Sequence, residues 1–577
     1  MDYMKLYRLW LEDPYFDETI RQELVSIGER KEIEDRFYRY LEFGTGGLRG
    51  LIGAGTNRIN RYTVRHATQG LSNYIHSFGP AAAARGVVIA YDSRQCSREF
   101  ALEAALTLNT NGILAYLWDS LRPTPMLSFA VRELGTIAGI VITASHNPPE
   151  YNGYKVYWED GGQIPPERAA AIQAAIRAIE DITKIHPMPE EEARAKGFLK
   201  PVPPEIDRKY YDRLLGLVTT TPEQRAACRI LYTPLHGTGN IPVRTVLTEA
   251  GYPVTVVKEQ EHPDPNFSTV KCPNPEEPEV FQLALRIAAE EQSDVILATD
   301  PDADRLGVMV RDRNGNYRLL NGNQVGAILV DFILSTRKAK GTLPPNGAVI
   351  KTIATSYMIE PLCREYGVEL LNTHTGFKFI GDKIREFEET GTHTFLFGYE
   401  ESYGYLGATF VRDKDAVMAA LLVAEAVAYH KAHGRTLYDA LQAIWAKCGC
   451  FLEDLHSVTL PGKEGQVQIA AIMEQLRREP PTSFGGIPVA YIDDYQVGVG
   501  LEVATGREYP LELGKANVLH FRFADRGFVM VRPSGTEPKL KIYFSVTGKN
   551  ETDAHRRLEA VKADALRMMN LPVVNRP

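Results

Sequence analysis

Short runs of apolar residues alternate along the chain with longer stretches that have the pattern of amphipathic helices. Residues 86–92, 113–117 and 137–143 are apolar runs of the length expected for buried strands. Helical patterns at 98–111 and 124–134 separate these runs. This strand–helix–strand order predicts a parallel or mixed sheet that is covered by helices.

The same alternation recurs twice further along the chain. Residues 230–233, 254–257 and 294–299 form a second group of strand-like runs, and residues 348–352 and 392–397 belong to a third group. Three groups of similar type place the chain in the α/β class.

The C-terminal part has a different order of elements. Strand-like runs at 528–532 and 540–546 bracket a loop, and a long helical pattern follows at about 551–569. This order predicts a smaller α+β domain. Residues 185–207 are rich in proline and charge, so we expect a linker there, and residues 262–278 are expected to be a long surface loop.

Length and composition restrict the class of protein. A chain of 577 residues is long enough for roughly three to five domains. Its 44% apolar and 24% charged residues are ordinary for a globular protein. The net charge of −8 argues against a nucleic-acid partner, which usually requires a basic surface. If the substrate is an anionic phosphate, positive charge must be concentrated in its site.

The chain is expected to work in the cytoplasm without a membrane partner. Its six cysteines are sparse and follow no disulfide or zinc framework, which indicates reduced thiols. The N-terminus lacks the apolar core of a signal peptide, and no apolar run is long enough for a membrane span. Residues 3–42 have amphipathic helical character instead, with Asp17 as a candidate helix cap.

Ser145 follows the strand-like run that ends at Thr143. Ligands of α/β sheets bind at the carboxyl ends of the strands. Three interpretations are open: a polar turn, a Ser–His hydrolase that uses His146, and a phosphorylated serine. The hydrolase is disfavoured because no Gly-x-Ser-x-Gly elbow is present, and because a histidine next in sequence need not point at its neighbour.

Asp300, Asp302 and Asp304 alternate directly after an apolar run. Residues two apart in an extended segment share one face, so the three carboxylates would repel one another without a cation. Such hard oxygen ligands suit Mg²⁺, and a phosphate on Ser145 would supply a further oxygen. A solvated acidic turn and a calcium loop are the alternatives. An EF-hand is disfavoured because arginines stand where its glycine and its last glutamate belong.

Two further segments offer groups that could bind a sugar phosphate. Glu400 and Ser402 follow a strand-like run and could hold neighbouring sugar hydroxyls, although acidic strand ends are common. The loop between the last two strand-like runs is richer in anion-binding groups than a plain hairpin requires. The residues of this predicted anion cradle are Arg532, Ser534, Gly535 and Thr536. Single charged candidates, each of which could be a surface charge, are Arg49, Lys155, His374, Lys378, Arg412 and Lys414.

Taken together and in this order, these motifs resemble the α-D-phosphohexomutase family. The matching segments are Thr143-Ala-Ser-His-Asn-Pro148, Asp300-Pro-Asp-Ala-Asp-Arg305, Gly398-Tyr-Glu-Glu-Ser-Tyr-Gly404 and Arg532-Pro-Ser-Gly-Thr-Glu-Pro538. The resemblance covers nearly the whole chain. It implies four domains around a central cleft: three related α/β domains with mixed sheets and a smaller α+β domain. Their expected bounds are 1–205, 206–322, 323–450 and 451–577.

The resemblance also implies a role for each candidate. Ser145 would carry the phosphate and would bind Mg²⁺ together with the three aspartates. The other implied catalytic residues are Arg49, His146, Lys155 and Lys414, of which the two lysines match positions considered for proton transfer or phosphate contact. The implied substrate-binding residues are Arg305, Lys378, Glu400, Ser402, Arg412, Arg532, Ser534, Gly535 and Thr536.

The branch of the family is indicated by the sequence Phe43-Gly-Thr-Gly-Gly-Leu-Arg49 and by the N-terminal extension. Both are similar to the phosphoglucomutase-2/phosphopentomutase branch and to related bacterial phosphoglucomutases. Glu400-Glu401-Ser402 resembles glucomutases, whereas phosphomannomutases more often have Glu-Met-Ser. Tyr399 departs from the usual Gly-Glu-Glu-Ser form, and pentomutases of this branch look alike here, so a hexose and a pentose both stay open as the sugar.

The implied reaction is the reversible conversion of α-D-glucose 1-phosphate into glucose 6-phosphate. It would proceed through a phosphoserine enzyme and glucose 1,6-bisphosphate, which would also act as activator. Alternatives are a phosphopentomutase, a phosphomannomutase, a bisphosphate synthase that uses an external donor, and a non-catalytic regulator that binds sugar phosphates. The protein would act as a monomer or a homodimer.

Overall fold

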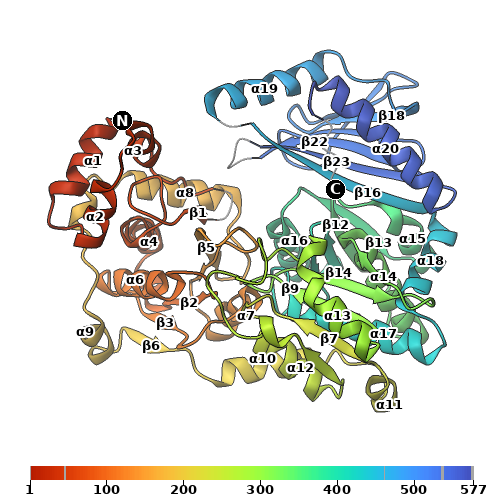
Figure 1. Cartoon of the computed structure of the whole chain (residues 1–577), viewed down its shortest axis with the longest axis horizontal. Helices are drawn as coiled ribbons and strands as arrows, with labels where there is room; N and C mark the ends of the chain where they lie inside the picture. The colour runs from red at the N-terminus through yellow and green to blue at the C-terminus, as the bar shows by residue number, and fades with distance from the viewer. Residues whose placement is uncertain (1, 45–46, 461, 535–538, 573–577) are drawn as a thin grey trace. The chain divides into compact units, whose positions relative to one another are not determined.

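The structure is a computed structural model that describes residues 2–44, 47–460, 462–534 and 539–572 (Figure 1). Two residues of the predicted anion cradle, Gly535 and Thr536, lie outside the described residues. The chain divides into two compact units. The first unit contains residues 1–321, 377–392 and 402–437, and the second contains residues 322–376, 393–401 and 438–577.

Three short helices begin the first unit. They are α1 (Tyr3–Glu12), α2 (Glu18–Val25) and α3 (Arg30–Phe37). As predicted, Asp17 caps α2, because its carboxylate accepts a hydrogen bond from the backbone N–H of Ile20. The helices share a small core in which the rings of Trp10 and Phe16 stack with centroids 4.3 Å apart.

The first sheet confirms the predicted mixed α/β arrangement. Its strands are β1 (Gly47–Leu51), β2 (Val87–Tyr91), β3 (Ala115–Leu117), β4 (Ala138–Ile142), β5 (Tyr151–Trp158) and β6 (Leu199–Pro201). They are ordered β1-β5-β4-β2-β3-β6. Strands β4, β2, β3 and β6 are parallel to one another, and β5 pairs antiparallel with both of its neighbours, β4 and β1. The accompanying helices are α4 (Arg61–His76), α5 (Pro80–Ala84), α6 (Ser97–Thr110), α7 (Thr124–Leu134), α8 (Pro166–Arg177) and α9 (Glu190–Ala195).

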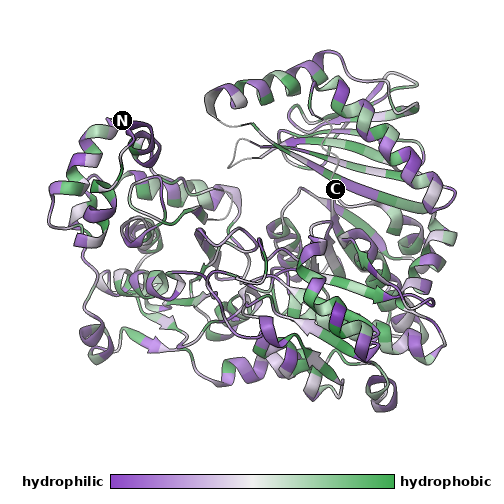
Figure 2. Ribbon diagram, in the orientation of Figure 1, coloured by the Kyte–Doolittle hydropathy of each residue, from purple (hydrophilic) through white to green (hydrophobic). Residues whose placement is uncertain are grey.

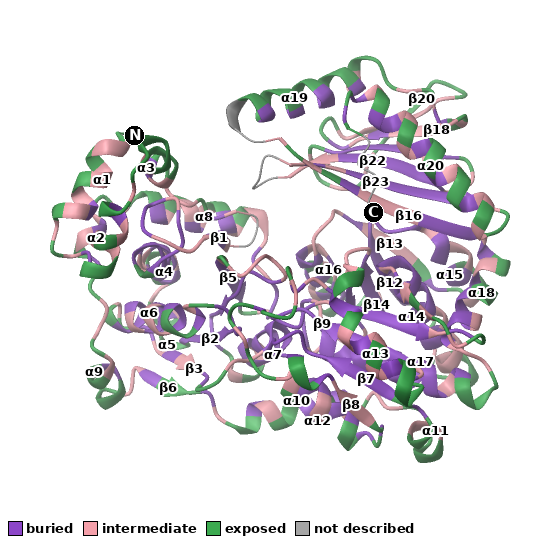
Figure 3. Ribbon diagram, in the orientation of Figure 1, coloured by how far each residue is buried: buried purple, intermediate pink, exposed green. Residues whose placement is uncertain are grey.

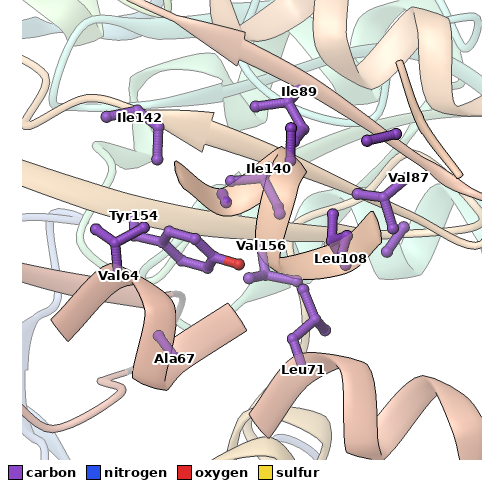
Figure 4. Close-up of a cluster of buried hydrophobic side chains, with 14 of the residues drawn as sticks. Val64, Ala67, Leu71, Val87, Ile89, Leu108, Ile140, Ile142, Tyr154 and Val156 are labelled. Atoms are coloured by element: carbon purple, nitrogen blue, oxygen red, sulfur yellow. The ribbon is translucent and has the colours of Figure 1, made fainter. Parts of the chain in front are cut away.

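The core of this sheet explains why its central strands are apolar at every position. Strands β2 and β4 are buried throughout, because helices cover both faces of the sheet. Figure 4 shows Ile89 and Ile140 from these strands among Val64 of α4, Leu108 of α6 and Val156 of β5. Each such side chain contributes roughly 1.5–3 kcal/mol when it is fully buried.

The prediction of a linker at residues 185–207 is wrong. This stretch contains helix α9 and strand β6, and β6 pairs in parallel with β3. Three of its charged residues, Glu190, Glu191 and Glu192, form the acidic first turn of α9, so part of the charge belongs to a helix. Residues 262–277 have no helix or strand, as expected for a loop, but Phe267 within them is fully buried.

The second sheet also belongs to the first unit. Its strands are β7 (Ile230–Thr233), β8 (Val254–Val256), β9 (Val295–Thr299), β10 (Leu306–Arg311) and β11 (Tyr317–Leu320). They are ordered β11-β10-β9-β7-β8. Strands β9, β7 and β8 are parallel to one another, and β10 pairs antiparallel with both of its neighbours, β9 and β11. The other elements of this part of the unit are α10 (Glu205–Leu215), α11 (Pro222–Ala226), η2 (Lys258–Gln260), α12 (Asn240–Glu249), η3 (Pro278–Phe281), α13 (Gln282–Glu291), α16 (Phe377–Thr390), β15 (Gly404–Leu406) and α17 (Ala416–Ala432).

The second unit begins with a parallel sheet. Its strands β12 (Gly347–Thr352), β13 (Glu369–Thr373) and β14 (Thr394–Glu400) pair in the order β13-β12-β14. The helices here are α14 (Gly322–Ala339), η4 (Tyr357–Ile359), α15 (Glu360–Tyr366) and α18 (Leu437–Cys448). Strand β14 continues past the predicted end of its apolar run, so Glu400 is the last residue of the strand and does not follow it.

The C-terminal part of the second unit is an antiparallel sheet with two long helices, which confirms the predicted α+β domain. Its strands are β16 (Cys450–Thr459), β17 (Ser483–Phe484), β18 (Ile487–Asp494), β19 (Val499–Glu502), β20 (Arg507–Pro510), β21 (Leu519–Phe523), β22 (Phe528–Pro533) and β23 (Lys539–Gly548). The main path is β16-β23-β22-β21-β18-β19-β20. The helices are α19 (Gly462–Arg478) and α20 (Glu551–Met568).

Hydropathy and burial follow the same arrangement in both units. The strands are largely apolar in Figure 2 and largely buried in Figure 3, whereas the outer faces of the helices are polar and exposed. All six cysteines are free thiols, as predicted. Within the part of the chain that the structure describes, no helix has both the length and the apolar character that crossing a membrane requires.

Candidate active site

Ser145 lies in a tight turn just beyond the carboxyl end of β4. Its backbone has φ = 54°, in the left-handed region that residues other than glycine rarely adopt. The side-chain hydroxyl of Thr143 accepts a hydrogen bond from the Ser145 N–H at 2.8 Å, which helps to hold this conformation. The serine is 3% exposed, so its hydroxyl faces the interior of the site. Backbone strain of this kind is typical of functional sites.

Arg94 holds the turn in place from below. Its guanidinium donates hydrogen bonds to four backbone carbonyl oxygens: those of Ser145 at 2.6 Å, Pro148 at 2.8 Å, Tyr151 at 3.1 Å and Asn147. Four carbonyls converging on one fork of donors fix the path of the loop that carries the serine. Sequence reasoning missed Arg94. Its position just after β2, at the strand-end edge where ligands bind, was the available signal.

The charge of Arg94 is balanced inside the protein. Its Nε lies 3.3 Å from Oδ2 of Asp92, and both side chains are fully buried. Burial lowers the pKa of Arg94 and raises the pKa of Asp92, so each charge depends on the other. The ring of Phe267 lies 5.0 Å from the guanidinium and shields this pair from water.

The predicted aspartate cluster lies directly against Ser145. The serine hydroxyl donates a hydrogen bond to Oδ2 of Asp300 at 2.8 Å, although the two residues are 155 positions apart. Oδ1 of Asp300 accepts hydrogen bonds from the backbone N–H groups of Asp304 at 3.1 Å and Arg305 at 3.0 Å. The loop between β9 and β10 therefore wraps around the Asp300 carboxylate and presents it to the serine.

The three aspartates have the geometry of a metal site. One carboxylate oxygen from each of Asp300, Asp302 and Asp304 lies within 4.8 Å of the others, and all three residues are buried. Oδ1 of Asp302 and Oδ1 of Asp304 are buried without a hydrogen-bond partner among the described residues. Buried carboxylate oxygens are normally satisfied, so these two fit a bound cation. The all-oxygen donor set is the one that Mg²⁺ prefers.

Two lysines compensate part of the negative charge. Nζ of Lys155 lies 2.7 Å from Oδ2 of Asp302 and 3.4 Å from Oδ2 of Asp304. Nζ of Lys414 lies 3.1 Å from the same oxygen of Asp304. Thr124 completes the shell, because its hydroxyl donates to Oδ2 of Asp302 at 2.8 Å.

These contacts give the aspartates different pKa values. Burial and the charges of Asp302 and Asp304 raise the pKa of Asp300 well above its ordinary value. Burial also opposes the charge of Asp304, but Lys414 and Lys155 outweigh it and lower the pKa of that carboxyl. Burial would lower the pKa of Lys155, yet the two aspartates outweigh it and raise that pKa. Ionisation of Asp300 is thus opposed by its protein surroundings, whereas that of Asp304 is favoured.

Three other predicted residues surround the serine. Nδ1 of His146 lies 3.1 Å from the Ser145 hydroxyl oxygen. The guanidinium of Arg49, on β1, donates to Oδ1 of Asn147 at 3.3 Å. Arg305 forms an ion pair with Glu276 and lies 3.9 Å from Oδ1 of Asp304. Glu276 was not among the candidates from the sequence.

A second cluster missed from the sequence lies behind Lys414. The phenol of Tyr157 donates to Oδ2 of Asp413 at 2.6 Å. The other oxygen of Asp413 accepts from Nζ of Lys414 at 3.1 Å. Since Asp413 is almost fully buried, it fixes the ammonium of Lys414 against the aspartate cluster. No local pattern distinguishes Tyr157 from an ordinary strand residue.

Three predicted substrate-binding residues lie elsewhere in the first unit. Lys378 is buried in the first turn of α16, with Nζ 5.3 Å from the ring centre of Phe379. Arg412 is also buried, and its guanidinium forms an ion pair with Glu388 of α16. Ser402 is half-buried just before β15.

The remaining predicted residues lie in the second unit. Glu400 accepts a hydrogen bond from the backbone N–H of Gly376 at 2.8 Å, and Nε2 of His374 lies 2.5 Å from the carbonyl oxygen of Gly514. Arg532 lies in β22, and Ser534 directly follows this strand. The antiparallel pairing of β22 with β23 confirms the predicted hairpin.

Comparison with models of known families matches four parts of the chain to the phosphoglucomutase/phosphomannomutase family. Residues 40–183, 208–315 and 321–448 match its alpha/beta/alpha domains I, II and III, and residues 504–563 match its C-terminal domain. The four matches follow the order of the family and cover most of the chain.

Individual relatives match over nearly the whole length. A phosphoglucomutase of Staphylococcus epidermidis is 37% identical over 532 residues, which are 92% of this chain and 95% of that protein. A phosphoglucomutase of Staphylococcus aureus is 36% identical over 538 residues, with the same coverage of both chains. A crystal structure of a phosphoglucomutase/phosphomannomutase family protein from Burkholderia thailandensis has the same fold, with a TM-score of 0.67 at 19% identity over 92% of this chain and 98% of that one.

Proposed function

We propose that this chain, which belongs to the phosphoglucomutase/phosphomannomutase family, interconverts α-D-glucose 1-phosphate and glucose 6-phosphate through a phosphate carried on Ser145. Full-length phosphoglucomutases that share more than a third of its residues support this activity. The enzyme is a phosphohexomutase, an isomerase that moves a phosphoryl group.

One observation carries the assignment of Ser145. Its hydroxyl lies 2.8 Å from Asp300, in a cluster whose buried carboxylate oxygens have the arrangement of a cation site. A polar turn does not need a serine in a left-handed conformation with its hydroxyl against three carboxylates. A Ser–His hydrolase would need a third group to orient His146, and the hydroxyl of Ser145 already donates to Asp300.

Asp300, Asp302 and Asp304 would hold Mg²⁺, together with an oxygen of the phosphate on Ser145. The ion would supply positive charge next to the group in transfer. Burial and the neighbouring carboxylates raise the pKa of Asp300, and a divalent cation bound to the three aspartates would oppose this effect by favouring the ionised carboxylate.

The chain's own residues would then position the reacting atoms. In the first transfer the bond between Oγ of Ser145 and phosphorus breaks, and a bond from phosphorus to a sugar hydroxyl oxygen forms. The sugar hydroxyl loses its proton, and Oγ of Ser145 gains one. In the second transfer the bond from phosphorus to the other sugar oxygen breaks, the bond to Oγ forms again, and the protons move in the opposite direction. Lys155 and Lys414 are the nearest candidates to move these protons, because they already contact the aspartates beside Ser145. Lys155, whose pKa is raised, would act as the proton donor. Arg49 and Arg305 would hold the phosphoryl oxygens.

A mutase must hold the sugar in two orientations. We assign this task to the substrate-binding residues, which would contact sugar hydroxyls and the phosphate that is not reacting: Lys378, Glu400, Ser402, Arg412, Arg532, Ser534, Gly535 and Thr536. Glucose 1,6-bisphosphate would form when Ser145 gives up its phosphate. It would then turn end for end and return the other phosphate to Ser145. Added bisphosphate would therefore activate enzyme whose serine has lost its phosphate.

Two experiments test this function. Rates with glucose 1-phosphate, ribose 1-phosphate and mannose 1-phosphate, each with Mg²⁺, should show the highest kcat/KM for the glucose ester. A higher kcat/KM for the ribose or mannose ester would contradict the assignment of substrate. Peptide mapping after incubation with glucose 1,6-bisphosphate should place one phosphoryl group on Ser145, and phosphate on another residue would contradict the assignment of the nucleophile.

A further inference from the structure

The irregular segment 262–277 contacts both loops of the candidate site. On one side, the thiol of Cys272 donates a hydrogen bond to the carbonyl oxygen of His146 at 2.8 Å, and the ring of Phe267 covers Arg94 beneath the serine turn. On the other side, the carboxylate of Glu276 forms an ion pair with Arg305 at the end of the aspartate loop. The 262–277 segment therefore links the serine turn to the metal loop.

The 262–277 segment is held in place, although it has no helix or strand. The two ring nitrogens of His236 lie 2.9 Å from the carbonyl oxygen of His262 and 2.8 Å from the hydroxyl of Thr269. Near its end, Pro275 packs against β10 so closely that a Cβ on Gly307 would lie 2.5 Å from the proline carbonyl oxygen. Only glycine fits at this approach, and it fixes the backbone next to Glu276.

The ion pair between Arg305 and Glu276 is connected to Ser145 through one residue, Asp300. The backbone N–H of Arg305 binds Oδ1 of Asp300, whose other oxygen accepts the hydroxyl of Ser145. The side chains of Arg305 and Glu276 are only 19% and 24% exposed, so the pair is partly shielded but not locked in the interior.

We propose that Glu276 is a positioning residue that competes with the phosphate on Ser145 for Arg305. While the serine carries a free hydroxyl, Glu276 holds the guanidinium. When the serine carries a phosphoryl group, the guanidinium turns to the phosphoryl oxygens, and it returns to Glu276 when the phosphate leaves. This inference rests on the proposed function, because it requires phosphate on Ser145.

Charge explains why such an exchange suits a mutase. A phosphoryl group brings about two negative charges to the serine, and arginine binds phosphate with two parallel hydrogen bonds. Without a competing anion, the guanidinium would hold the phosphate in the bisphosphate as firmly as on the enzyme. The phosphate of the bisphosphate must separate from the guanidinium before the sugar can turn, so equally tight binding of both states would slow turnover. Glu276 would weaken the binding of the bisphosphate phosphate to Arg305 at the step in which the sugar must turn.

The test compares Glu276→Gln with Glu279→Gln, a control at an exposed glutamate in the following turn. Glutamine at 276 keeps the shape of the side chain but removes the competing charge. We expect kcat and KM to fall together, kcat by about tenfold, which is the worth of one charge-assisted hydrogen bond. The concentration of glucose 1,6-bisphosphate that half-activates dephosphorylated enzyme should also fall by about threefold or more. The control should match the wild type.

A double-mutant cycle separates this role from a merely structural one. In the Arg305→Gln background, Glu276→Gln should have no further effect, because its effect passes through Arg305. A variant with a raised KM, a lower Tm and the same loss in both backgrounds would overturn the proposal, as would a variant that matches the control. If peptide mapping of the wild type finds no phosphate on Ser145, the proposed function fails, whatever the variants show.

Discussion

The aspartate cluster of the first unit and a buried lysine of the second unit differ in whether the structure pairs their charges. In the first unit, the aspartate cluster beside Ser145 is buried, but Lys155 and Lys414 lie within ion-pair distance of it. In the second unit, Lys351 on β12 is fully buried, and among the described residues the structure gives it no ion pair. Its ammonium donates only to the carbonyl oxygens of Thr352 and Thr355 and lies 3.8 Å from the ring centre of Tyr357.

The consequence for ionisation differs accordingly. Burial lowers the pKa of Lys351 to about 7, and burial lowers the pKa of nearby His520 well below its ordinary value. At the aspartate cluster, opposite charges outweigh burial and preserve the ionised forms of Asp304 and Lys155. Burial without a partner of opposite charge favours the neutral form of a side chain, whereas burial beside such a partner favours the ionised form, which a catalytic site can use.

The largest effect should come from the nucleophile. Ser145→Ala removes the only atom that can carry the phosphate, so we expect mutase activity to fall by at least about 10⁴-fold, the scale seen when a covalent nucleophile is lost. The removed hydroxyl makes one hydrogen bond to a side chain of the metal cluster, and circular dichroism should show an unchanged fold. Activity near that of the wild type would contradict a phosphoserine mechanism.

The aspartate cluster should be next in size. Asp302→Asn keeps the volume of the side chain but removes a charge from the ligand set, and we expect activity to fall by about 10³-fold. Thermal unfolding provides an independent readout. Mg²⁺ should raise the Tm of the wild type, because it binds the folded state, and should no longer raise the Tm of the variant. An equal shift in both proteins would place the cation elsewhere.

Lys155 tests whether the paired lysines take part in the chemistry. Lys155→Met should lower kcat by about 10²-fold, the usual contribution of a group that moves a proton. Lys351→Met is the matched control, because it removes a buried lysine that lies in the other unit. It should keep activity within about twofold of the wild type, on the usual scale of changes away from a site. Similar losses in both variants would contradict the distinction between the two regions.

Arg94 should have a smaller effect, because it acts through the backbone. Arg94→Lys keeps the charge but cannot reach four carbonyl oxygens at once. We expect a fall in kcat of about tenfold, since a loop that has lost one or two charged hydrogen bonds holds Ser145 less firmly. Phosphate transfer from glucose 1,6-bisphosphate to Ser145, followed in a single turnover, should slow by the same factor. An unchanged transfer rate would show that the turn is held by other contacts.

The smallest effect on activity, and the clearest effect of pH, concerns Lys351. Its pKa is about 7 in the folded protein, whereas an unfolded lysine keeps its ordinary, higher pKa. Between these values the unfolded state binds more protons, so the free energy of unfolding of the wild type should rise as the pH increases from about 7 to 10. Below this window Lys351 is protonated in both states, and burial of its ammonium lowers the stability by on the order of 4 kcal/mol relative to high pH.

Lys351→Met should remove this dependence. Urea unfolding at pH 7 and pH 9.5 should give the variant a smaller increase in stability than the wild type, and a higher stability at the lower pH. An equal increase in both proteins would mean that Lys351 keeps its charge in the folded state.

The parts of the account that could be predicted from the sequence are those that depend on neighbouring residues. The strand-like runs became β2, β4, β7 and β9, and the prediction that the carboxylates of Asp300, Asp302 and Asp304 meet is confirmed. The reason given for it is wrong, because a turn between β9 and β10 brings them together and not an extended segment. Family resemblance joined these aspartates to Ser145. The linker expected at residues 185–207 failed because composition does not distinguish an exposed short helix and an edge strand from a loop.

The groups that were missed act only through the tertiary fold. Arg94 stands at the end of a strand-like run, but its role becomes visible only when four carbonyl oxygens of the serine turn converge on it, and that of Asp413 only when it joins Tyr157 to Lys414. Glu276 stands in a loop rich in proline and acidic residues, where nothing local distinguishes it from its neighbours. Pairing of charges across domains has no periodicity, so no pattern of spacing could have revealed these residues.

The central claim is that the aspartate cluster and Ser145 form one phosphate-transfer site. The most direct measurement is the rate at which glucose 1,6-bisphosphate phosphorylates Ser145, followed by mass spectrometry of the intact protein and its peptides while Mg²⁺ is added or removed by a chelator. The account predicts that the serine peptide gains one phosphoryl group with Mg²⁺ and none after chelation, and that Asp302→Asn abolishes the gain. Equal phosphorylation of Ser145 with and without the cation, or in the Asp302→Asn variant, would contradict it.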